Sequence, residues 1–185
     1  MLMNLAKRGK KRTRKNKKDL GPKRKNRKLN PIKVVHGNLL NHTTDYIMHQ
    51  VNCLTKKCHK SKTHIATQIF EKYPKANVYS RRKNDGVPGN IIIIHPVISL
   101  LAMKYPGEPK WENCKENRFS WFKECLEKLE NHFKDEKVSI GFPYKIGCGL
   151  AGGDWELYNK TLEDFGKKNE NITLCMYKLQ DKKTF

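Results

Sequence analysis

The sequence predicts a single α/β domain, with a sheet of mainly parallel strands, behind a basic N-terminal tail. Apolar, strand-like runs alternate with segments of helical spacing from residue 32 onward, whereas the residues before are almost all polar or basic. A glycine-rich stretch joins one strand-like run directly to a helix-like run. Alternating strands and helices favour a layered α/β domain that binds ligands at the carboxyl ends of its strands. The 185 residues are enough for one such domain and a tail.

Two strands and a helix are predicted in the first half of the domain. Residues 32–36 are predicted to form a short strand that ends at Gly37, and residues 46–54 a second, largely apolar strand. Residues 63–73 place Ile65, Ile69 and Tyr73 on one helical face, and Pro74 ends that helix.

The middle of the chain predicts two further strands and the longest helix. The uninterrupted run Ile91–Ile94 follows a turn at 86–89 and is expected to be a buried central strand. Pro96 separates it from a second strand over 97–103. A helix is predicted over 112–133, because apolar residues recur there at helical spacing: Phe119, Phe122, Leu126, Leu129 and Phe133.

The last third of the chain predicts a strand, a glycine loop, a helix and a strand. The strand covers 138–143, the helix runs from about 155 to 167, and the closing strand covers 172–179. Between the first strand and the helix, four of the seven residues 147–153 are glycine. Such a loop leaves backbone N–H groups uncovered near a helix N-terminus, where a phosphate or diphosphate is favoured. The alternative is a tight turn that needs glycine only for its positive φ angles.

Most of the positive charge lies in the tail. The net charge is +21, and residues 1–33 hold 15 of the 39 lysines and arginines and a single acid. Residues 1–31 contain too few apolar side chains to offset the entropy of folding, so we expect them to be disordered. The basic clusters within residues 7–28 resemble a bipartite nuclear-localisation segment and predict salt-dependent binding to RNA or DNA. The alternative is a solubilising tail without a partner.

The composition also limits the class of protein. We find neither a secretory signal nor a run approaching the ~20 apolar residues of a membrane span. The six cysteines include no CxxC pair, which suits reduced thiols in the cytosol or nucleus. Cys53, Cys58, His59 and His64 match the spacing of no common zinc module, so we expect no metal and no cofactor.

Three segments resemble the macro domain superfamily, in the order in which that family uses them: Val34–Leu40, Ile47–Cys53 and Phe142–Leu150. The resemblance covers roughly residues 32–180 and is greatest to the branch of ADP-ribose-1″-phosphate phosphatases and terminal ADP-ribose glycohydrolases. It implies a three-layer α/β/α domain over 32–185, with a mixed, mainly parallel sheet and a cleft for ADP-ribose.

The resemblance also implies a set of binding residues. Gly37, Asn38 and Leu39 match the segment at the adenine end, where Asn38 replaces the family's aspartate. Asn52 matches the asparagine that contacts the distal ribose. The diphosphate loop corresponds to Gly147, Cys148, Gly149, Leu150, Ala151 and Gly152.

Three departures from the family bear on catalysis. Residues 55–62 contain no glycine, although the family often has a glycine-rich stretch there. Ala151 stands where the glycohydrolase branch has its catalytic aspartate, and the next carboxylate is Asp154. Lys104 is the residue that could correspond to the nucleophilic lysine of that branch. Without the aspartate, the resemblance does not support a mechanism through a covalent lysine adduct.

Several side chains are candidates for the remaining chemistry, each with a structural alternative. His49 is a candidate general base or a hydrogen-bonded core residue, and Asp154 orients a water or caps a helix. Cys148 is an activated thiol or a small residue in a crowded loop. Tyr144 and Tyr177 are candidates to stack on adenine or ribose, or are core aromatics. Asn52, His49 and Asp154 are our candidate catalytic residues, and Tyr177 is added to the binding set.

The sequence therefore predicts a monomeric domain that binds ADP-ribose or a derivative modified at the distal ribose. The domain is expected to hydrolyse ADP-ribose-1″-phosphate or to remove ADP-ribose from proteins. The alternatives are a non-catalytic ADP-ribose reader and a basic nucleic-acid-binding protein whose α/β domain is only a scaffold. The location is expected to be nuclear or cytoplasmic, and the basic tail favours the nucleus.

Overall fold

The computed structural model describes residues 31–58, 61 and 63–180. The predicted tail therefore lies outside the described residues, apart from residue 31, and so do residues 181–185. The boundary between tail and domain stays a prediction.

A mixed sheet of six strands forms the centre of the described part of the chain, in the order β1-β6-β5-β2-β4-β3. All neighbouring strands are parallel except β3 and β4, which are antiparallel. The strands are β1 (Lys33–His36), β2 (Tyr46–Asn52), β3 (Ile91–Ile94), β4 (Val97–Met103), β5 (Val138–Pro143) and β6 (Ile172–Lys178).

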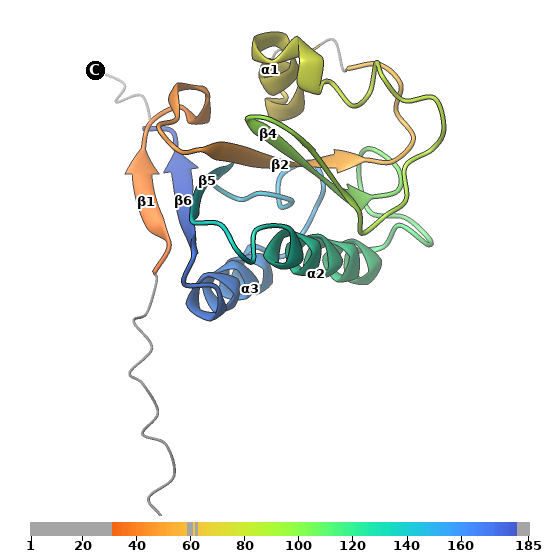
Figure 1. Ribbon diagram of the computed structural model, residues 1–185. Coiled ribbons are helices and arrows are strands. Elements are labelled where there is room, and N and C mark those ends of the chain that lie inside the picture. Colours follow the sequence, from red (N-terminus) through yellow and green to blue (C-terminus); the bar gives the residue numbers. More distant parts are fainter. Residues whose placement is uncertain (1–30, 59–60, 62, 181–185) are drawn as a thin grey trace, which may run out of the picture.

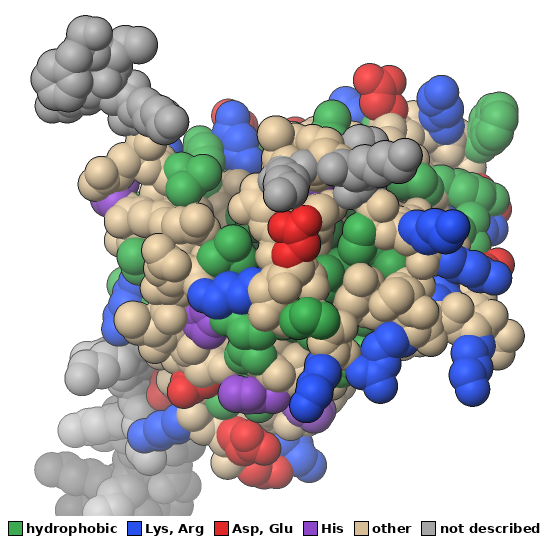
Figure 2. All heavy atoms as spheres, turned by 90° about the horizontal axis from the view of Figure 1, so that it is seen from above, with side chains coloured by type: hydrophobic (Ala, Val, Ile, Leu, Met, Phe, Trp, Pro, Cys, Tyr) green, Lys and Arg blue, Asp and Glu red, His purple; other side chains and the backbone are tan. Residues whose placement is uncertain are grey.

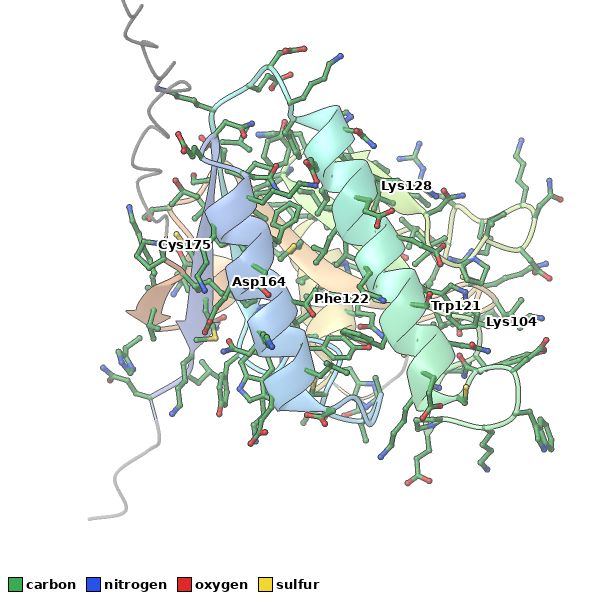
Figure 3. The ribbon with its side chains drawn as sticks, turned by 90° about the horizontal axis from the view of Figure 1, so that it is seen from below. Lys104, Trp121, Phe122, Lys128, Asp164 and Cys175 are labelled. Atoms are coloured by element: carbon green, nitrogen blue, oxygen red, sulfur yellow. The ribbon has the colours of Figure 1, made fainter. Side chains whose placement is uncertain are left out.

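Helices cover both faces of this sheet (Figure 1). The helices α2 (Lys115–His132) and α3 (Trp155–Lys168) lie side by side on one face, as Figures 1 and 3 both show. The shorter α1 (Ile65–Lys72) lies on the opposite face. The predicted three-layer α/β/α fold is therefore confirmed. Two 3-10 helices, Leu39–Asn41 and Pro74–Ala76, lie in the connections.

The larger core lies between the sheet and the pair α2 and α3. Phe122 points from α2 toward α3, where its ring centroid is 4.5 Å from that of Tyr158 (Figure 3). The sheet contributes Met48, Ile98 and Leu100, all without solvent exposure. Burying a side chain of this size stabilises the fold by about 1.5–3 kcal/mol, so the apolar stripe of α2 contributes to holding that helix on the sheet.

The second core lies under α1. Ile69 and Phe70 pack there against Ile47 and Val51 of β2. Successive residues of a strand point to opposite faces, so Ile47 enters this core while Met48 enters the other one. Burial on both faces explains why apolar residues of β2 point into both cores.

The position predicted for Ile91–Ile94 was wrong, because β3 is an edge strand of the sheet. The two-residue connection His95–Pro96 returns the chain alongside β3 as β4, and so short a connection allows only an antiparallel neighbour. The four isoleucines are half-buried, and they alternate between the two cores. The strand is apolar throughout because both of its faces are covered, although it lies at the edge of the sheet and not at its centre.

Among the described residues, no helix is long and apolar enough to cross a membrane.

Candidate functional site

The loops that follow the parallel strands meet at one edge of the sheet, because the carboxyl ends of parallel strands point the same way. The segment after β1 holds Gly37 and Asn38, and the segment after β4 begins at Lys104. The glycine loop, residues 144–153, connects β5 to α3. The structure therefore brings the predicted binding segments to the same edge.

Tight turns shape the glycine loop. Gly147 and Gly152 have φ angles of 74° and 64°, which glycine adopts at little cost. The N–H of Gly152 donates to the carbonyl of Gly149 at 2.9 Å, and the N–H of Gly153 donates to that of Gly147 at 3.0 Å. These bonds close the loop just before α3 begins.

Three consecutive N–H groups at the tip of this loop remain unused. Those of Gly149, Leu150 and Ala151 donate to no acceptor within the described part of the chain. The tip is open to solvent, since the Leu150 side chain is 70% exposed. A run of unpaired amides in a turn makes a concave site for an anion, such as a phosphate oxygen.

Gln50 and Tyr158 form the floor of the loop beneath Gly147. A Cβ atom on Gly147 would clash with Oε1 of Gln50 and would lie 2.6 Å from Cε1 of Tyr158. Both side chains are buried, and neither Gln50 Oε1 nor the Tyr158 hydroxyl has a hydrogen-bond partner in the described residues. The loop therefore rests directly on a polar floor that leaves no room for a side chain at Gly147.

Arg118 supports the glycine loop from α2, although we did not predict a role for it. Its side chain is 1% exposed and donates to the carbonyl of Ala151 at 2.7 Å and to that of Gly107 at 2.9 Å. Burial lowers the pKa of the guanidinium, and among the described residues no carboxylate pairs with it. The sequence could have indicated that Arg118 is buried, because it lies one helical turn before Phe122 and therefore on the same face of the helix.

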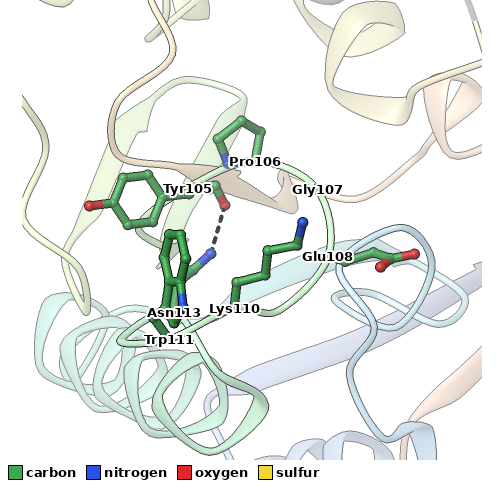
Figure 4. Close-up of a pocket in the computed structure, with 7 residues that line it drawn as sticks. All are labelled: Tyr105, Pro106, Gly107, Glu108, Lys110, Trp111 and Asn113. Carbon is green, nitrogen blue, oxygen red and sulfur yellow. Dashed lines mark hydrogen bonds between the residues drawn. The ribbon is translucent and has the colours of Figure 1, made fainter.

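A pocket of about 340 Å³ lies in the loop that follows β4, and it too was not predicted (Figure 4). Trp111, on its rim, is 89% exposed and has a φ angle of 43°. Asn113 Nδ2 donates to the carbonyl of Tyr105 at 3.2 Å and braces the loop. The pocket is lined by Tyr105, Pro106, Gly107, Glu108, Lys110, Trp111 and Asn113.

Lys104 is paired with a carboxylate at the start of the same loop. Its ammonium group lies 2.8 Å from Oε1 of Glu112, which also accepts the hydroxyl of Tyr105 at 2.8 Å. The hydrogen bond to Glu112 raises the pKa of Lys104, so this lysine is a cation near pH 7. A charged ammonium group has no free electron pair for nucleophilic attack.

Asn52 is held within the loop that follows β2. Its Oδ1 accepts the N–H groups of Leu54 at 3.1 Å and Thr55 at 2.8 Å, while Nδ2 donates to the Tyr79 hydroxyl at 3.2 Å. Arg82 adds bonds to the carbonyls of Asn52 and Thr55, both at 2.9 Å. Asn52 is only 4% exposed. The side chain thus shapes the start of this loop, and one of its two amide N–H groups donates to no acceptor among the described residues.

His49 lies in the core under α1 and not at the edge of the sheet. It has no solvent exposure, its ring packs edge-on against Phe70, and Nε2 lies 3.3 Å from the Ser99 hydroxyl. Burial lowers the pKa of His49 to about 3. A base that weak, without access to substrate, does not suit proton transfer near pH 7, so the structure supports the core alternative.

The structural alternatives also account for Asp154 and Cys148. The carboxylate of Asp154 caps α3 by accepting the N–H groups of Glu156 at 2.9 Å and Leu157 at 3.4 Å. Burial raises the pKa of Cys148 to about 12, and its thiol donates to the carbonyl of Ile146 at 3.3 Å. Both observations favour a small residue in a crowded loop over an activated thiol, because burial disfavours the thiolate.

The residues predicted for the adenine end divide into exposed and buried ones. Asn38 is exposed and caps the first 3-10 helix through Oδ1, which accepts the N–H of Leu40. Leu39 and Tyr177 are buried in the core under α1, and the Tyr177 hydroxyl accepts the N–H of Thr43 at 3.3 Å. Tyr144 is an exposed aromatic that follows β5, with the ammonium groups of Lys145 and Lys178 at 5.5 Å and 5.1 Å from its ring centre.

Basic side chains are prominent on the face of the molecule on which α1 lies (Figures 1 and 2). In the space-filling view, Lys and Arg side chains gather along one side of this face, and acidic side chains are fewer (Figure 2). The described residues contain no group of three His, Cys, Asp or Glu side chains that could hold a metal ion.

No protein-family model matches the sequence, and neither does any curated protein. Solved macrodomains nevertheless share its architecture. The macrodomain of Mycobacterium tuberculosis DarG is similar with a TM-score of 0.63 and 19% identity, over 79% of this chain and 96% of the other. The macrodomain of Thermus aquaticus DarG has a TM-score of 0.59 and 19% identity, over 80% and 97% of the two chains.

A third similar structure contains a ligand. The macrodomain of Trypanosoma brucei in complex with ADP-ribose has a TM-score of 0.55 and 11% identity, over 80% of this chain and 63% of that one. At these identities the comparison shows the fold: the chain has the fold of a macrodomain.

Proposed function

We propose that this protein binds ADP-ribose, free or attached to protein, with the diphosphate on the amides of the glycine loop. The observation that carries the proposal is the row of three unpaired N–H groups at Gly149, Leu150 and Ala151. They lie at the carboxyl end of β5, where α/β sheets bind ligands. The ADP-ribose complex of the similar T. brucei macrodomain supports the choice of ligand.

The remaining contacts of the ligand follow from the same edge of the sheet. Asn38, exposed after β1, accepts a hydrogen bond from adenine, although without the charge of an aspartate. Asn52 donates its second amide N–H to a hydroxyl of the distal ribose. Tyr144 supplies the exposed aromatic face that Tyr177 does not offer.

We further propose that the protein hydrolyses the 1″-phosphate of ADP-ribose-1″-phosphate, or an ester at the distal ribose. It would do so by positioning a water molecule, without a covalent lysine adduct. Ala151 has no carboxylate, and Lys104 is an ion-paired cation. Alignment of substrate and water, together with amides that stabilise developing charge, accelerates such a reaction without a strong base. Turnover should therefore survive replacement of Lys104 by methionine.

A second function, that of a non-catalytic reader of ADP-ribose, is favoured by the surroundings of three polar side chains. His49 is buried in the core, Asp154 is occupied as a helix cap, and Lys104 is paired with Glu112. His49 and Lys104 are therefore engaged in other contacts, and Asp154 is committed through Oδ1 to capping α3, which favours a binding role over catalysis.

Calorimetry and a phosphate-release assay test these functions together. Saturable one-to-one heat with ADP-ribose supports binding, and its absence contradicts the proposed function. If ADP-ribose binds, release of phosphate from ADP-ribose-1″-phosphate identifies a hydrolase. Binding without turnover of that compound or of ADP-ribosylated protein identifies a reader.

We further propose that the tail binds RNA or DNA and directs the protein to the nucleus. The support is the composition of residues 1–33, which carry 15 basic residues and one acid. Each phosphate neutralised by such a segment releases counterions, so the affinity should fall steeply with salt.

A further inference from the structure

A single buried side chain connects the glycine loop to the pocket loop, residues 104–114. The Nη1 atom of Arg118 donates both to Gly107 O, at 2.9 Å, and to Ala151 O, at 2.7 Å. Its Nη2 atom donates to Glu108 O at 3.1 Å and to Tyr105 O at 3.4 Å. Four carbonyls from two loops thus converge on one guanidinium group. A lysine ammonium cannot reproduce that arrangement, because it lacks the planar fork of donors.

The bond to Ala151 sets the orientation of a peptide group in the glycine loop. The C=O and N–H of a planar trans peptide point in opposite directions, so fixing the carbonyl of Ala151 toward Arg118 also fixes the N–H of Gly152. That N–H donates to Gly149 O at 2.9 Å and closes the turn that carries the three unpaired amides. Arg118 therefore acts on the direction of these amides through one rigid peptide unit.

The pocket loop also touches the glycine loop at a second point. A Cβ atom on Gly152 would lie 3.0 Å from Cδ of Pro109 and 3.2 Å from its Cγ. The two loops therefore pack together without a gap beside the arginine. Two loops that lie this close, and that share the hydrogen bonds of Arg118, are expected to move together.

The charge of Arg118 contributes in addition to its hydrogen bonds. The guanidinium group is 1% exposed and, among the residues that the structure describes, is neutralised by no carboxylate. This charge lies 2.7 Å from the Ala151 carbonyl of the glycine loop, and a positive charge that is shielded from water attracts a nearby anion more strongly than an exposed one does.

From these observations we propose that Arg118 is a positioning residue for the diphosphate of the ligand. It holds the turn Gly149–Gly152 in its anion-binding conformation, places a buried positive charge beneath it, and couples it to the pocket loop. This inference rests on the proposed binding of ADP-ribose.

Full-length variants test the proposal by separating diphosphate binding from general stability. Arg118→Lys keeps the charge and removes the fork, and Arg118→Met removes both. We expect Arg118→Lys to weaken ADP-ribose binding roughly tenfold, as expected for lost charge-assisted hydrogen bonds, and Arg118→Met to weaken it further. Adenosine, which lacks the diphosphate, should bind both variants as it binds the unmodified protein. Equal losses for ADP-ribose and adenosine, or no loss for ADP-ribose, would overturn the proposal.

Hydrogen exchange of the ligand-free chain separates this proposal from the proposed function. In Arg118→Lys, amide exchange should rise together in residues 105–108 and 149–153. Arg81→Lys is the matched control, since Arg81 also donates to a carbonyl, that of Lys75, and should leave both segments unchanged. If the unmodified protein does not bind ADP-ribose, the proposed function fails, while the exchange data still decide whether Arg118 holds the loop.

A variant on the loop side covers the case in which changes at Arg118 prevent folding. Pro109→Ser alters a residue that is not in the core and removes the contact with Gly152. It should raise exchange in residues 149–153 and weaken ADP-ribose binding more than adenosine binding. Unchanged exchange and affinity in Pro109→Ser would contradict the coupling of the two loops.

Discussion

Gly147 shows most directly why the loop after β5 is rich in glycine. Its φ angle of 74° is unfavourable for other residues, and its Cα faces Gln50 and Tyr158 without space for a Cβ atom. Gly147→Ala should therefore lower the free energy of unfolding by roughly 1–3 kcal/mol, the usual cost of a strained backbone conformation. Chemical denaturation measures this loss.

Gly149 in the same loop provides the control for that substitution. A Cβ atom there would meet nothing within 4 Å, and its φ angle is not in the left-handed region. Gly149→Ala should leave the unfolding free energy nearly unchanged. Equal destabilisation by the two substitutions would show that the floor under Gly147 is not tightly packed.

His49 predicts a specific dependence of stability on pH. Burial lowers its pKa to about 3 in the folded protein, from 6.5 for a free histidine, so the unfolded chain binds one more proton between these values. The stabilisation is complete above pH 6.5 and is lost as the pH falls toward 3, at up to about 1.4 kcal/mol per pH unit. His49→Gln should flatten the unfolding free energy between pH 6.5 and 4. If both proteins lose stability with the same slope, His49 is not buried in its neutral form.

At the scale of elements, Asp154 caps the start of α3, and substitutions at this position test whether its role is structural or catalytic. Asp154 accepts two N–H groups of the first turn. Asp154→Ala should cost about 1 kcal/mol of stability, whereas Asp154→Asn should retain most of it because an amide oxygen also caps helices. Thermal denaturation of the two variants tests this role. Loss of hydrolase activity in Asp154→Asn at unchanged stability would instead assign a catalytic role to the carboxylate.

Most elements were predictable because their apolar residues repeat with the period of the structure that they form. The helix around Phe122 and the strand 138–143 were recognisable from this pattern alone. The place of Ile91–Ile94 in the sheet was not, because strand order depends on how the chain returns after residue 94. The pattern of apolar residues indicates which faces of a strand are covered, but it does not indicate which strands lie next to it in the sheet.

The site was predictable only in part, for a related reason. Glycines with positive φ angles leave a local signal, so the loop at 147–153 was found from the sequence. Arg118 acts through carbonyls that are distant in the chain, and backbone carbonyls carry no sequence signature. His49 shows the opposite case. Its residue type suggested catalysis, but the alternation of side chains along β2 points it into the core under α1.

The whole molecule combines a moderately basic domain with a strongly basic tail, and the two should act independently. Residues 34–185 carry a net charge of only +7, against +14 for residues 1–33. Removing residues 1–31 should abolish most of the affinity for a single-stranded oligonucleotide at low salt and leave ADP-ribose binding unchanged. Fluorescence anisotropy at two salt concentrations measures the first effect, and calorimetry measures the second. Undiminished oligonucleotide binding would place the nucleic-acid surface on the domain.

The most direct test of the account is a backbone amide NMR titration of the full chain with ADP-ribose. We predict that the N–H signals of Gly149, Leu150 and Ala151 shift most and that their exchange with solvent slows, because each amide gains an acceptor. Shifts that leave these three signals unchanged, or that centre instead on the pocket at Tyr105 and Trp111, would contradict the assignment of the glycine loop as the diphosphate site.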